Sequence, residues 1–336
     1  MKRKVIISFV SLAVFVAGFF MLQRLLVPKY VTENREGALI REYYDNAGGN
    51  DIIFIGDCEV YESFSPMRLW EKYGITSYVR GSANQTIWQS YYILKETLKY
   101  ETPKVVVFNV LSMKYDKPVK EEYNRLTLDG MKFSLEKMQA VSASMTEEEN
   151  PVSYIFPILR FHYRYSELTK EDIKYYITRP QVSYMGYLMN KNVKPYTVLP
   201  SRQKLADYSF SDVCYDYLDR ITRLCSENNI ELILVKAPSL YPYWYDEWDD
   251  DMEEYAKNNG LFYINFLECA DETGIDYSTD TYDGGLHLNL YGAEKLTDYF
   301  GKMLISDLNI EFSQKSDTIS RKWNERLEEY AEERTR

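Results

Sequence analysis

The stretch "DIIFIGDCEVYES", from Asp51 to Ser63, begins as an apolar run and breaks into a glycine, an acid and a thiol. Residues 52–55 have the continuous apolar composition of a strand that is covered on both faces. Two residues, Gly56 and Asp57, separate this run from Cys58. Because ligands bind beyond the carboxyl ends of the strands in open α/β sheets, this stretch predicts that Cys58 lies at the edge where such a sheet carries its site.

Strands and helices alternate through most of the rest of the chain. Apolar runs predict further strands at residues 75–79, 104–112, 230–238 and 261–266, and helical spacing predicts helices at 67–73, 85–100, 210–229, 245–260 and 291–306. The alternation lapses at about 113–208, where two helical patterns occur at 127–150 and 168–176. Strands separated by helices of this length predict an α/β fold with a parallel sheet and one long insertion after the third strand.

The N-terminus predicts a membrane anchor. Three basic residues, Lys2 to Lys4, precede an uncharged apolar run from Val5 to Leu22. A spanning helix needs about 20 such residues, and basic flanks favour the cytoplasmic side. A cleaved signal peptide is the rival interpretation, but no Ala-x-Ala site follows the run.

We therefore expect a protein of the cell membrane that spans it once, with its N-terminus in the cytoplasm and most of the chain outside. The expected organisation is a cytoplasmic tip at 1–4, an anchor at 5–27, a polar stem at 28–50, an α/β domain at 51–310 and a charged C-terminal helix at 311–336. An apolar stripe along that last helix favours packing on its own domain.

Composition excludes some classes of protein. The 336 residues are 45% hydrophobic and carry a net charge of −11, which argues against binding to a phosphate backbone. No zinc-finger, P-loop or Rossmann glycine pattern occurs. The acidic run at 246–254 lacks the ligand spacing of a calcium loop. We expect neither a nucleic-acid partner nor a cofactor or metal.

The ends of the other predicted elements add the groups of an acyl-transfer site. Gly81 ends the second strand, Asn109 the third, and a glycine-rich loop with Asp283 and His287 precedes the last long helix. A thiol nucleophile needs a histidine base, an acid to orient that base, and donors for the oxyanion. The chain has two histidines. Because His162 lies in the insertion, His287 is the candidate base.

The blocks "FIGDCEVYESFSP", "RGSANQ", "VVVFNV" and "DGGLHLNLYGAEK" resemble the ordered blocks of SGNH/GDSL-type hydrolases. With the anchor, the layout is similar to the membrane-anchored extracytoplasmic branch, which includes the D-alanine-transfer protein of teichoic acid D-alanylation and envelope O-acetylation proteins. The resemblance covers about 51–112 and 209–306. It implies a flavodoxin-like three-layer sandwich and a Ser-His-Asp site that acts on esters.

On this resemblance the family's nucleophile corresponds to Cys58, its acid and histidine to Asp283 and His287, and its oxyanion donors to Gly81 and Asn109. Three departures are visible. The nucleophile is a cysteine, the third block lacks the Gly-x-Asn-Asp form, and the position three residues before the histidine is Gly284. Either the loop bulges so that Asp283 reaches the imidazole, or Asp280 takes its place.

The expected function is transfer or hydrolysis of an acyl ester on a cell-envelope polymer or glycan, with a membrane-bound acyl-donor protein as a partner. A nearby imidazolium or a helix N-terminus can lower a thiol pKa below its free value of about 8.5. The alternatives are a non-catalytic envelope binding or assembly factor and a carbohydrate-binding module in the insertion. Cys214, Cys225 and Cys269 are expected to be small buried side chains. The first two lie too far apart on one helix for a disulfide.

Overall fold

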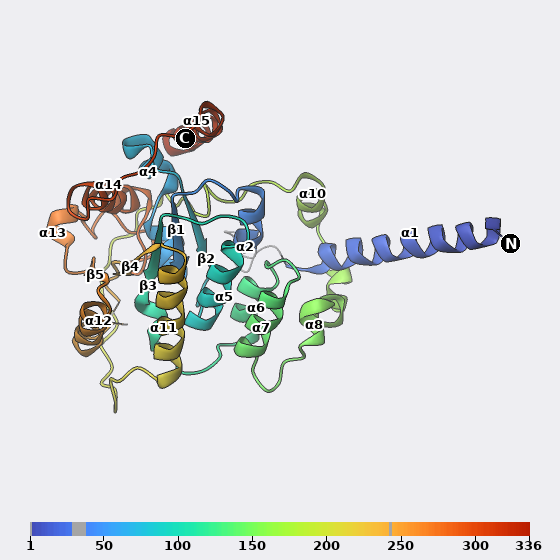
Figure 1. Cartoon of the computed structure of the whole chain (residues 1–336), viewed down its shortest axis with the longest axis horizontal. Helices are drawn as coiled ribbons and strands as arrows, with labels where there is room; N and C mark the ends of the chain where they lie inside the picture. The colour runs from blue at the N-terminus through green and yellow to red at the C-terminus, as the bar shows by residue number, and fades with distance from the viewer. Residues whose placement is uncertain (1, 29–37, 242–243) are drawn as a thin grey trace.

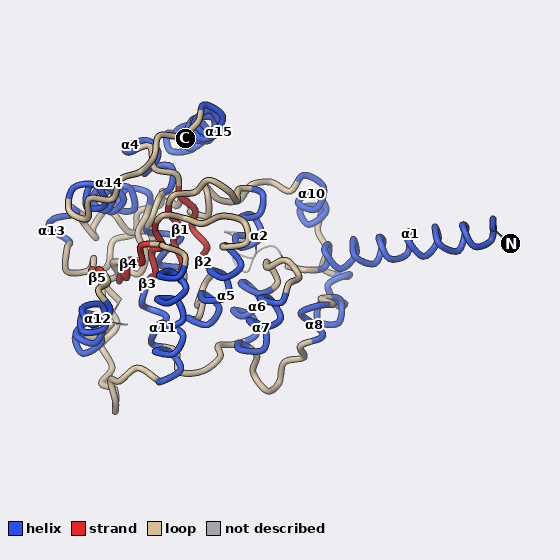
Figure 2. Tube along the Cα trace, in the orientation of Figure 1, coloured by secondary structure: helices blue, strands red, loops and turns tan. Residues whose placement is uncertain are grey.

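The computed structural model describes residues 2–28, 38–241 and 244–336. Its centre is a five-stranded sheet in the order β2-β1-β3-β4-β5, and every neighbouring pair is parallel (Figures 1 and 2). This is the strand order of flavodoxin-like folds. The predicted three-layer α/β architecture is confirmed. The strands are β1 (Ile52–Gly56), β2 (Ser77–Gly81), β3 (Val105–Asn109), β4 (Glu231–Lys236) and β5 (Phe262–Asn265).

The strand register brings the carboxyl ends of the inner strands together. Every residue of β1, β2 and β3 is buried, as the apolar runs of β1 and β3 predict, and in β2 this burial includes the polar Ser77 and Arg80. Gly56 is level with Gly81, and Asn109 is level with Val235. The residues that follow β1, β2, β3 and β4 therefore meet at one edge of the sheet.

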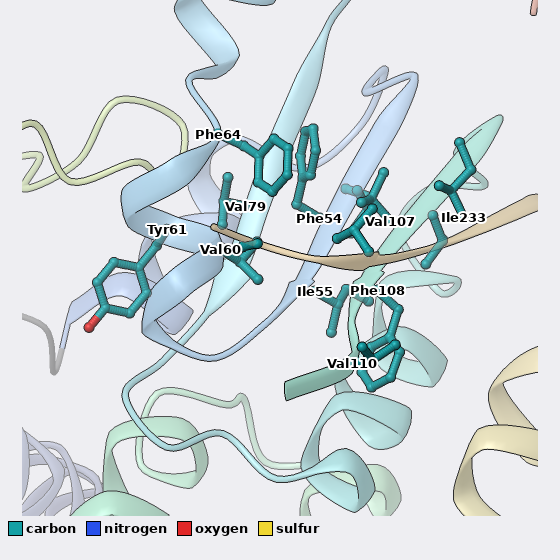
Figure 3. Packing of buried hydrophobic residues seen from close by; sticks show 14 of the residues in the cluster. Phe54, Ile55, Val60, Tyr61, Phe64, Val79, Val107, Phe108, Val110 and Ile233 are labelled. Carbon is teal, nitrogen blue, oxygen red and sulfur yellow. The ribbon is translucent and has the colours of Figure 1, made fainter. Parts of the chain in front are cut away.

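Helices cover both faces of the sheet. The face that carries Phe54 packs against α3 (Cys58–Ser63), α4 (Pro66–Tyr73) and α14 (Leu290–Ser306). There the ring of Phe54 stacks on Phe64 at 4.7 Å between centroids and lies 5.7 Å from Phe300 (Figure 3). The opposite face packs against α5 (Ile87–Thr97) and α11 (Asp212–Glu227). The short helix α13 (Ala270–Thr273) contacts α14, and α12 (Asp246–Asn259) contacts β5.

The first half of the insertion is part of the domain. The single helix expected at 127–150 is two, α6 (Glu121–Leu128) and α7 (Leu135–Ser144), because the chain turns at Gly130, where a Cβ would meet Ile40 at 2.7 Å. The Gln89 side chain of α5 donates to Asn124 and to Ser144, at 3.0 and 3.2 Å. These buried hydrogen bonds join α6 and α7 to α5. The other elements in and next to the insertion are η3 (Val110–Lys114), α8 (Val152–Ile155), α9 (Ile158–Phe161), η4 (His162–Ser166) and α10 (Lys170–Thr178).

The expected polar stem at 28–50 does not extend to the start of β1. Residues 29–37 lie outside the described residues, but α2 (Leu39–Glu42) and η2 (Tyr43–Asp45) contribute buried side chains to the core. The Arg80 guanidinium lies 3.9 Å from the Tyr43 ring centroid and pairs with Glu96 at 3.1 Å. The polar composition of this stretch did not indicate burial. Its tyrosines nevertheless bury their rings while their hydroxyls donate to acidic side chains.

The two ends of the chain behave differently. The C-terminal helix α15 (Asp317–Thr335) packs on α4, with the Trp70 and Trp323 rings 5.6 Å apart, so its predicted packing on the domain is confirmed. The N-terminal helix α1 (Lys2–Leu26) projects away from the domain (Figure 1). It is long and apolar enough to cross a membrane, and none of its most apolar 18-residue window is buried.

We predict that Gly56→Ala destabilises the domain by about 1–3 kcal/mol, the usual cost of an overpacked core. A Cβ at this position would collide with the Val60 side chain and lie 2.9 Å from the Asn109 Cβ. Urea unfolding measures the loss. Adding Val60→Ala to the Gly56→Ala protein removes the nearest obstacle and should cost less than the two single losses added together. Simple additivity of the two losses would contradict this packing.

Candidate active site

Cys58 occupies the first position of α3, directly after the turn that ends β1. Asp57 has extended backbone angles, with φ −88° and ψ −154°, and its carboxylate accepts the Glu59 N–H at 3.2 Å. Asp57 is therefore the N-cap of α3. The sequence analysis missed this six-residue helix. Cys58 is partly exposed at the carboxyl edge of the sheet.

The loop before α14 bends so that Asp283 reaches His287. Gly284 and Gly285 have φ angles of +89° and +99°, a region that side chains other than glycine rarely adopt. With this bend, Asp283 Oδ1 accepts the His287 backbone N–H at 2.9 Å and Oδ2 lies 2.7 Å from His287 Nδ1. Asp280 instead pairs with Lys295 at 2.6 Å. Of the two alternatives, the bulged loop with Asp283 is the one observed.

The thiol of Cys58 and the imidazole of His287 meet at this edge. Each lies close enough to shift the pKa of the other. Because Nδ1 faces carboxylates, Nε2 is the nitrogen left for the sulfur. Nε2 is buried, and no nitrogen or oxygen in the described part of the chain bonds to it. The nucleophile and base that the sequence predicted are therefore neighbours.

A second carboxylate, which the sequence analysis missed, also lies beside the imidazole. Glu62 Oε2 is 3.1 Å from His287 Nδ1, and the side chain is almost fully buried. Glu62 is four residues after Cys58, so α3 presents both on one side. The Tyr282 ring stacks on the His287 ring at 6.0 Å and 14°, and burial together with the Glu62 charge raises the pKa of the Tyr282 hydroxyl. The four-residue spacing between Cys58 and Glu62 could have indicated this carboxylate, but only if a helix were known to begin at Cys58.

These surroundings set the protonation of the pair. Burial raises the pKa of the Cys58 thiol to about 11, although His287 opposes the shift. Burial alone would lower the pKa of His287, but Glu62, the Cys58 sulfur and the hydrogen bond that the imidazole donates to Asp283 outweigh it, and this pKa lies well above 6.5. Hydrogen bonding to His287 lowers the pKa of Asp283 despite its burial. Both directions favour the protonated forms of the thiol and of the imidazole, so loss of one proton from the pair creates the nucleophile.

A buried charged network lies behind the nucleophile. Lys236, the last residue of β4, places its ammonium 2.8 and 3.0 Å from the two Glu59 carboxylate oxygens. Asn109, at the end of β3, donates to Asp57 at 3.0 Å and to Glu59 at 3.1 Å, and its carbonyl oxygen accepts the Ala237 N–H. Both amide hydrogens of Asn109 are thus used. An oxyanion at the predicted Asn109 donor would have to displace one of these carboxylates.

Gly81 lies directly beside the turn that carries Cys58. A Cβ there would be 3.0 Å from the Asp57 carbonyl oxygen and 3.3 Å from the Tyr61 ring. The absence of a side chain at Gly81 lets the end of β2 approach the start of α3 closely.

The last part of the insertion joins the nucleophile helix to the histidine loop. The Leu188 N–H donates to the Tyr61 carbonyl of α3 at 2.9 Å. Six residues on, the Lys194 N–H donates to the Thr281 carbonyl at 2.9 Å, and the Lys194 carbonyl accepts the Gly284 N–H at 3.1 Å. The sequence analysis assigned no role to this segment. Its backbone bonds fix α3 and the His287 loop relative to each other.

The other predicted residues lie away from this edge or are structural. His162 is exposed on η4, beside the Tyr163 ring. All four cysteines are free thiols; Cys214 and Cys225 are buried on α11, whereas Cys269 is partly exposed. Among residues 2–28, 38–241 and 244–336, no group of His, Cys, Asp and Glu has the arrangement of a metal site.

No protein-family model and no curated protein matches the chain. The solved structures that it resembles include a candidate lipolytic protein of the G-D-S-L family from Desulfitobacterium hafniense, with 11% identity, a TM-score of 0.36 and coverage of 75% of this chain and 99% of that one. A candidate acylhydrolase from Bacteroides fragilis has 11% identity, a TM-score of 0.38 and coverage of 80% and 95%. A GDSL-like lipase from Bacteroides thetaiotaomicron has 13% identity, a TM-score of 0.38 and coverage of 82% and 98%. Likenesses this distant do not say what this chain does.

We predict that Glu62→Gln shifts the pH dependence of Cys58 reactivity to lower pH by roughly one unit. The Glu62 charge raises the pKa of both the thiol and the imidazole, so its removal lets the pair lose its proton earlier. The measurement is the rate of alkylation by iodoacetamide over a pH range that extends above the Cys58 pKa of about 11, followed at each cysteine by mass spectrometry. Cys269 serves as the internal control. A midpoint at Cys58 that does not move would contradict an effect of Glu62 on this pair.

We predict that Lys236→Met destabilises the protein by about 3–5 kcal/mol, because it leaves the Glu59 carboxylate buried beside Asp57 without the ammonium that pairs with it. Adding Glu59→Gln to this variant removes this unpaired charge and should restore most of the loss. Urea unfolding of the single and double variants measures both effects. A double variant as unstable as Lys236→Met alone would mean that the unpaired charge is not the cause.

Proposed function

We propose that this protein transfers or hydrolyses acyl esters through a covalent thioester on Cys58. The observation that carries the proposal is that the Cys58 thiol lies close enough to the His287 imidazole for each to shift the pKa of the other, with His287 Nδ1 2.7 Å from Asp283. A nucleophile, a base and an orienting acid in this order are the components of covalent acyl transfer.

In the first step the Cys58 thiol loses its proton, and the resulting thiolate, beside the protonated His287, attacks the carbonyl carbon of an ester. The tetrahedral intermediate collapses, the carbon–oxygen bond to the leaving alcohol breaks, and His287 gives its proton to that oxygen. In the second step His287 takes a proton from water or from an acceptor hydroxyl, which attacks the thioester. The thiolate leaves and regains a proton. The cycle consumes no oxidant, reductant or cofactor.

The oxyanion of each tetrahedral intermediate requires hydrogen-bond donors. The Cys58 N–H is the first of α3, where a helix offers no intrahelical acceptor. We assign this N–H and the Gly81 N–H as the donors, because Gly81 lies against the same turn. Asn109 is assigned to the turn itself, since its amide holds Asp57 and Glu59.

The proposed substrate is an acyl ester on a cell-envelope polymer or glycan, reached from the outer side of the membrane. Helix α1 supports an anchor by its length and composition, and Lys2 to Lys4 favour an N-terminus in the cytoplasm. A polymer acceptor also suits a thioester, because a thiolate is a good leaving group. A membrane-bound protein that supplies acyl groups is the proposed partner.

We predict that the full chain hydrolyses p-nitrophenyl acetate and that Cys58→Ala and His287→Ala each lower the rate by roughly 100-fold or more, since both groups act on the reacting atoms. Mass spectrometry of the quenched wild type should find an acetyl group on the peptide that contains Cys58. His162→Ala is the matched control and should leave the rate unchanged.

Equal rates in the wild type and both site variants, with a polymer acceptor present as well, would sink the catalytic proposal. The raised pKa of the buried thiol is the observation that favours the rival, a non-catalytic envelope binding or assembly factor. That rival predicts that Cys58→Ala complements a bacterial deletion strain as well as the wild-type gene does.

A further inference from the structure

The insertion carries a concentration of exposed apolar side chains around the base of α1. In the described part of the chain, sixteen large apolar side chains outside α1 are exposed, and six of them lie in a short stretch between residues 156 and 177. We refer to these six as the apolar collar: Phe156, Leu159, Tyr163, Tyr165, Ile173 and Ile177. Exposed apolar surface of this density marks an interaction site in a domain that otherwise buries its core.

The elements of the collar contact the end of α1 directly. The Phe19 and Phe156 ring centroids are 6.3 Å apart. The Ile158 N–H donates to Gln23 Oε1 at 3.5 Å, and the Arg164 guanidinium donates to the Leu26 carbonyl at 2.6 Å. Figure 1 shows α8 and α10 on either side of the point where α1 leaves the domain. The collar therefore surrounds α1 and continues its apolar surface.

The position of the charges along α1 sets the depth of these contacts. Lys4 and Arg24 bracket the apolar run, and at 1.5 Å per residue they are about 30 Å apart, the thickness of the hydrocarbon core. Phe19 precedes Arg24 by five residues, which places it about 7.5 Å closer to the N-terminus of the helix and therefore deeper in the hydrocarbon core than Arg24. Phe156 contacts Phe19 and so lies at the same level, inside the outer boundary of that core.

Helix α10 has the residue pattern of a helix that lies on a membrane surface. Lys170, Ile173, Lys174 and Ile177 follow one another at spacings that place them on one side, and all four are exposed. The buried side chains of α10 are Asp172 and Tyr175. Apolar side chains between lysines suit the boundary between acyl chains and anionic headgroups.

We infer that the apolar collar inserts into the headgroup boundary of the bilayer that α1 spans. The inference rests on the proposed anchoring by α1 and goes beyond it. A single helix with a flexible linker would let the domain tumble above the membrane, whereas a collar embedded around that helix holds the domain against the surface in one orientation. The partner of this surface is lipid with anionic headgroups.

Photo-crosslinking of the full chain tests this inference. p-Benzoylphenylalanine replaces Ile177 or Tyr165 in the collar, Phe15 in α1, or Ile305 on α14, and each protein is placed in nanodiscs of phosphatidylethanolamine and phosphatidylglycerol. Ile305 is the matched control, because it is 42% exposed and α14 lies at the opposite end of the molecule from α1 (Figure 1). Mass spectrometry should find lipid adducts at Phe15, Ile177 and Tyr165, and none at Ile305.

The remaining outcomes separate the two ideas. Lipid adducts at Phe15 alone would overturn the collar and leave the anchor intact, and the absence of adducts at Phe15 would overturn both. The catalytic proposal is independent of all these results. In native membranes, adducts of Ile177 with a protein in place of lipid would assign the surface to a membrane-protein partner and overturn the inference.

Discussion

The buried ion pair between Lys236 and Glu59 is the constraint on which the carboxyl edge of the sheet depends. Both side chains are at most 3% exposed, and their closest atoms are 2.8 Å apart. Burying two charges costs several kcal/mol per ion unless the geometry and the remaining hydrogen bonds are nearly complete. Here Asn109 supplies the missing bonds and extends the network to Asp57. The network joins the ends of β3 and β4 to the first turn of α3, and so it fixes the position of the Cys58 backbone.

The network also explains why the thiol environment is unusual. Asp57 and Glu59 flank Cys58 in the chain, yet both turn back into the domain, toward Asn109. Burial and the Glu59 charge raise the pKa of Asp57 to about 6, so this carboxyl retains part of its proton in mildly acidic solution. On the other side of Cys58, Glu62 and Asp283 act on the imidazole. The thiol thus lies between acids that stabilise the turn and acids that stabilise the positive charge of His287.

Much of the fold could be predicted because it depends on short apolar runs. Strands such as Val105–Asn109 consist of β-branched and aromatic residues, and no other arrangement buries them so simply. The pairing of Cys58 with His287 could be predicted because both follow from the rule that parallel strands expose their carboxyl ends at one edge. Glu62 and Lys236 could not, because a charged residue in an α/β sequence is usually at the surface. Their burial depends on tertiary partners that no local pattern reveals.

The insertion is where sequence patterns carried the least information and where the structure adds the most. Its first half joins the core through Asn124 and Ser144, its middle surrounds α1, and its end bonds to Tyr61 and Thr281 on the two halves of the site. One segment of chain is therefore in contact with the proposed anchor and with the helix and the loop that carry the proposed catalytic pair. In this arrangement the membrane would fix the middle of the insertion. Eleven residues after Ile177, the same backbone reaches Leu188, which bonds to the nucleophile helix. Under the proposed function, an orientation set by the insertion would present the Cys58 edge to a polymer substrate repeatedly in the same way. This coupling gives a physical reason for a long insertion in this position, which neither the sheet nor the catalytic pair requires by itself.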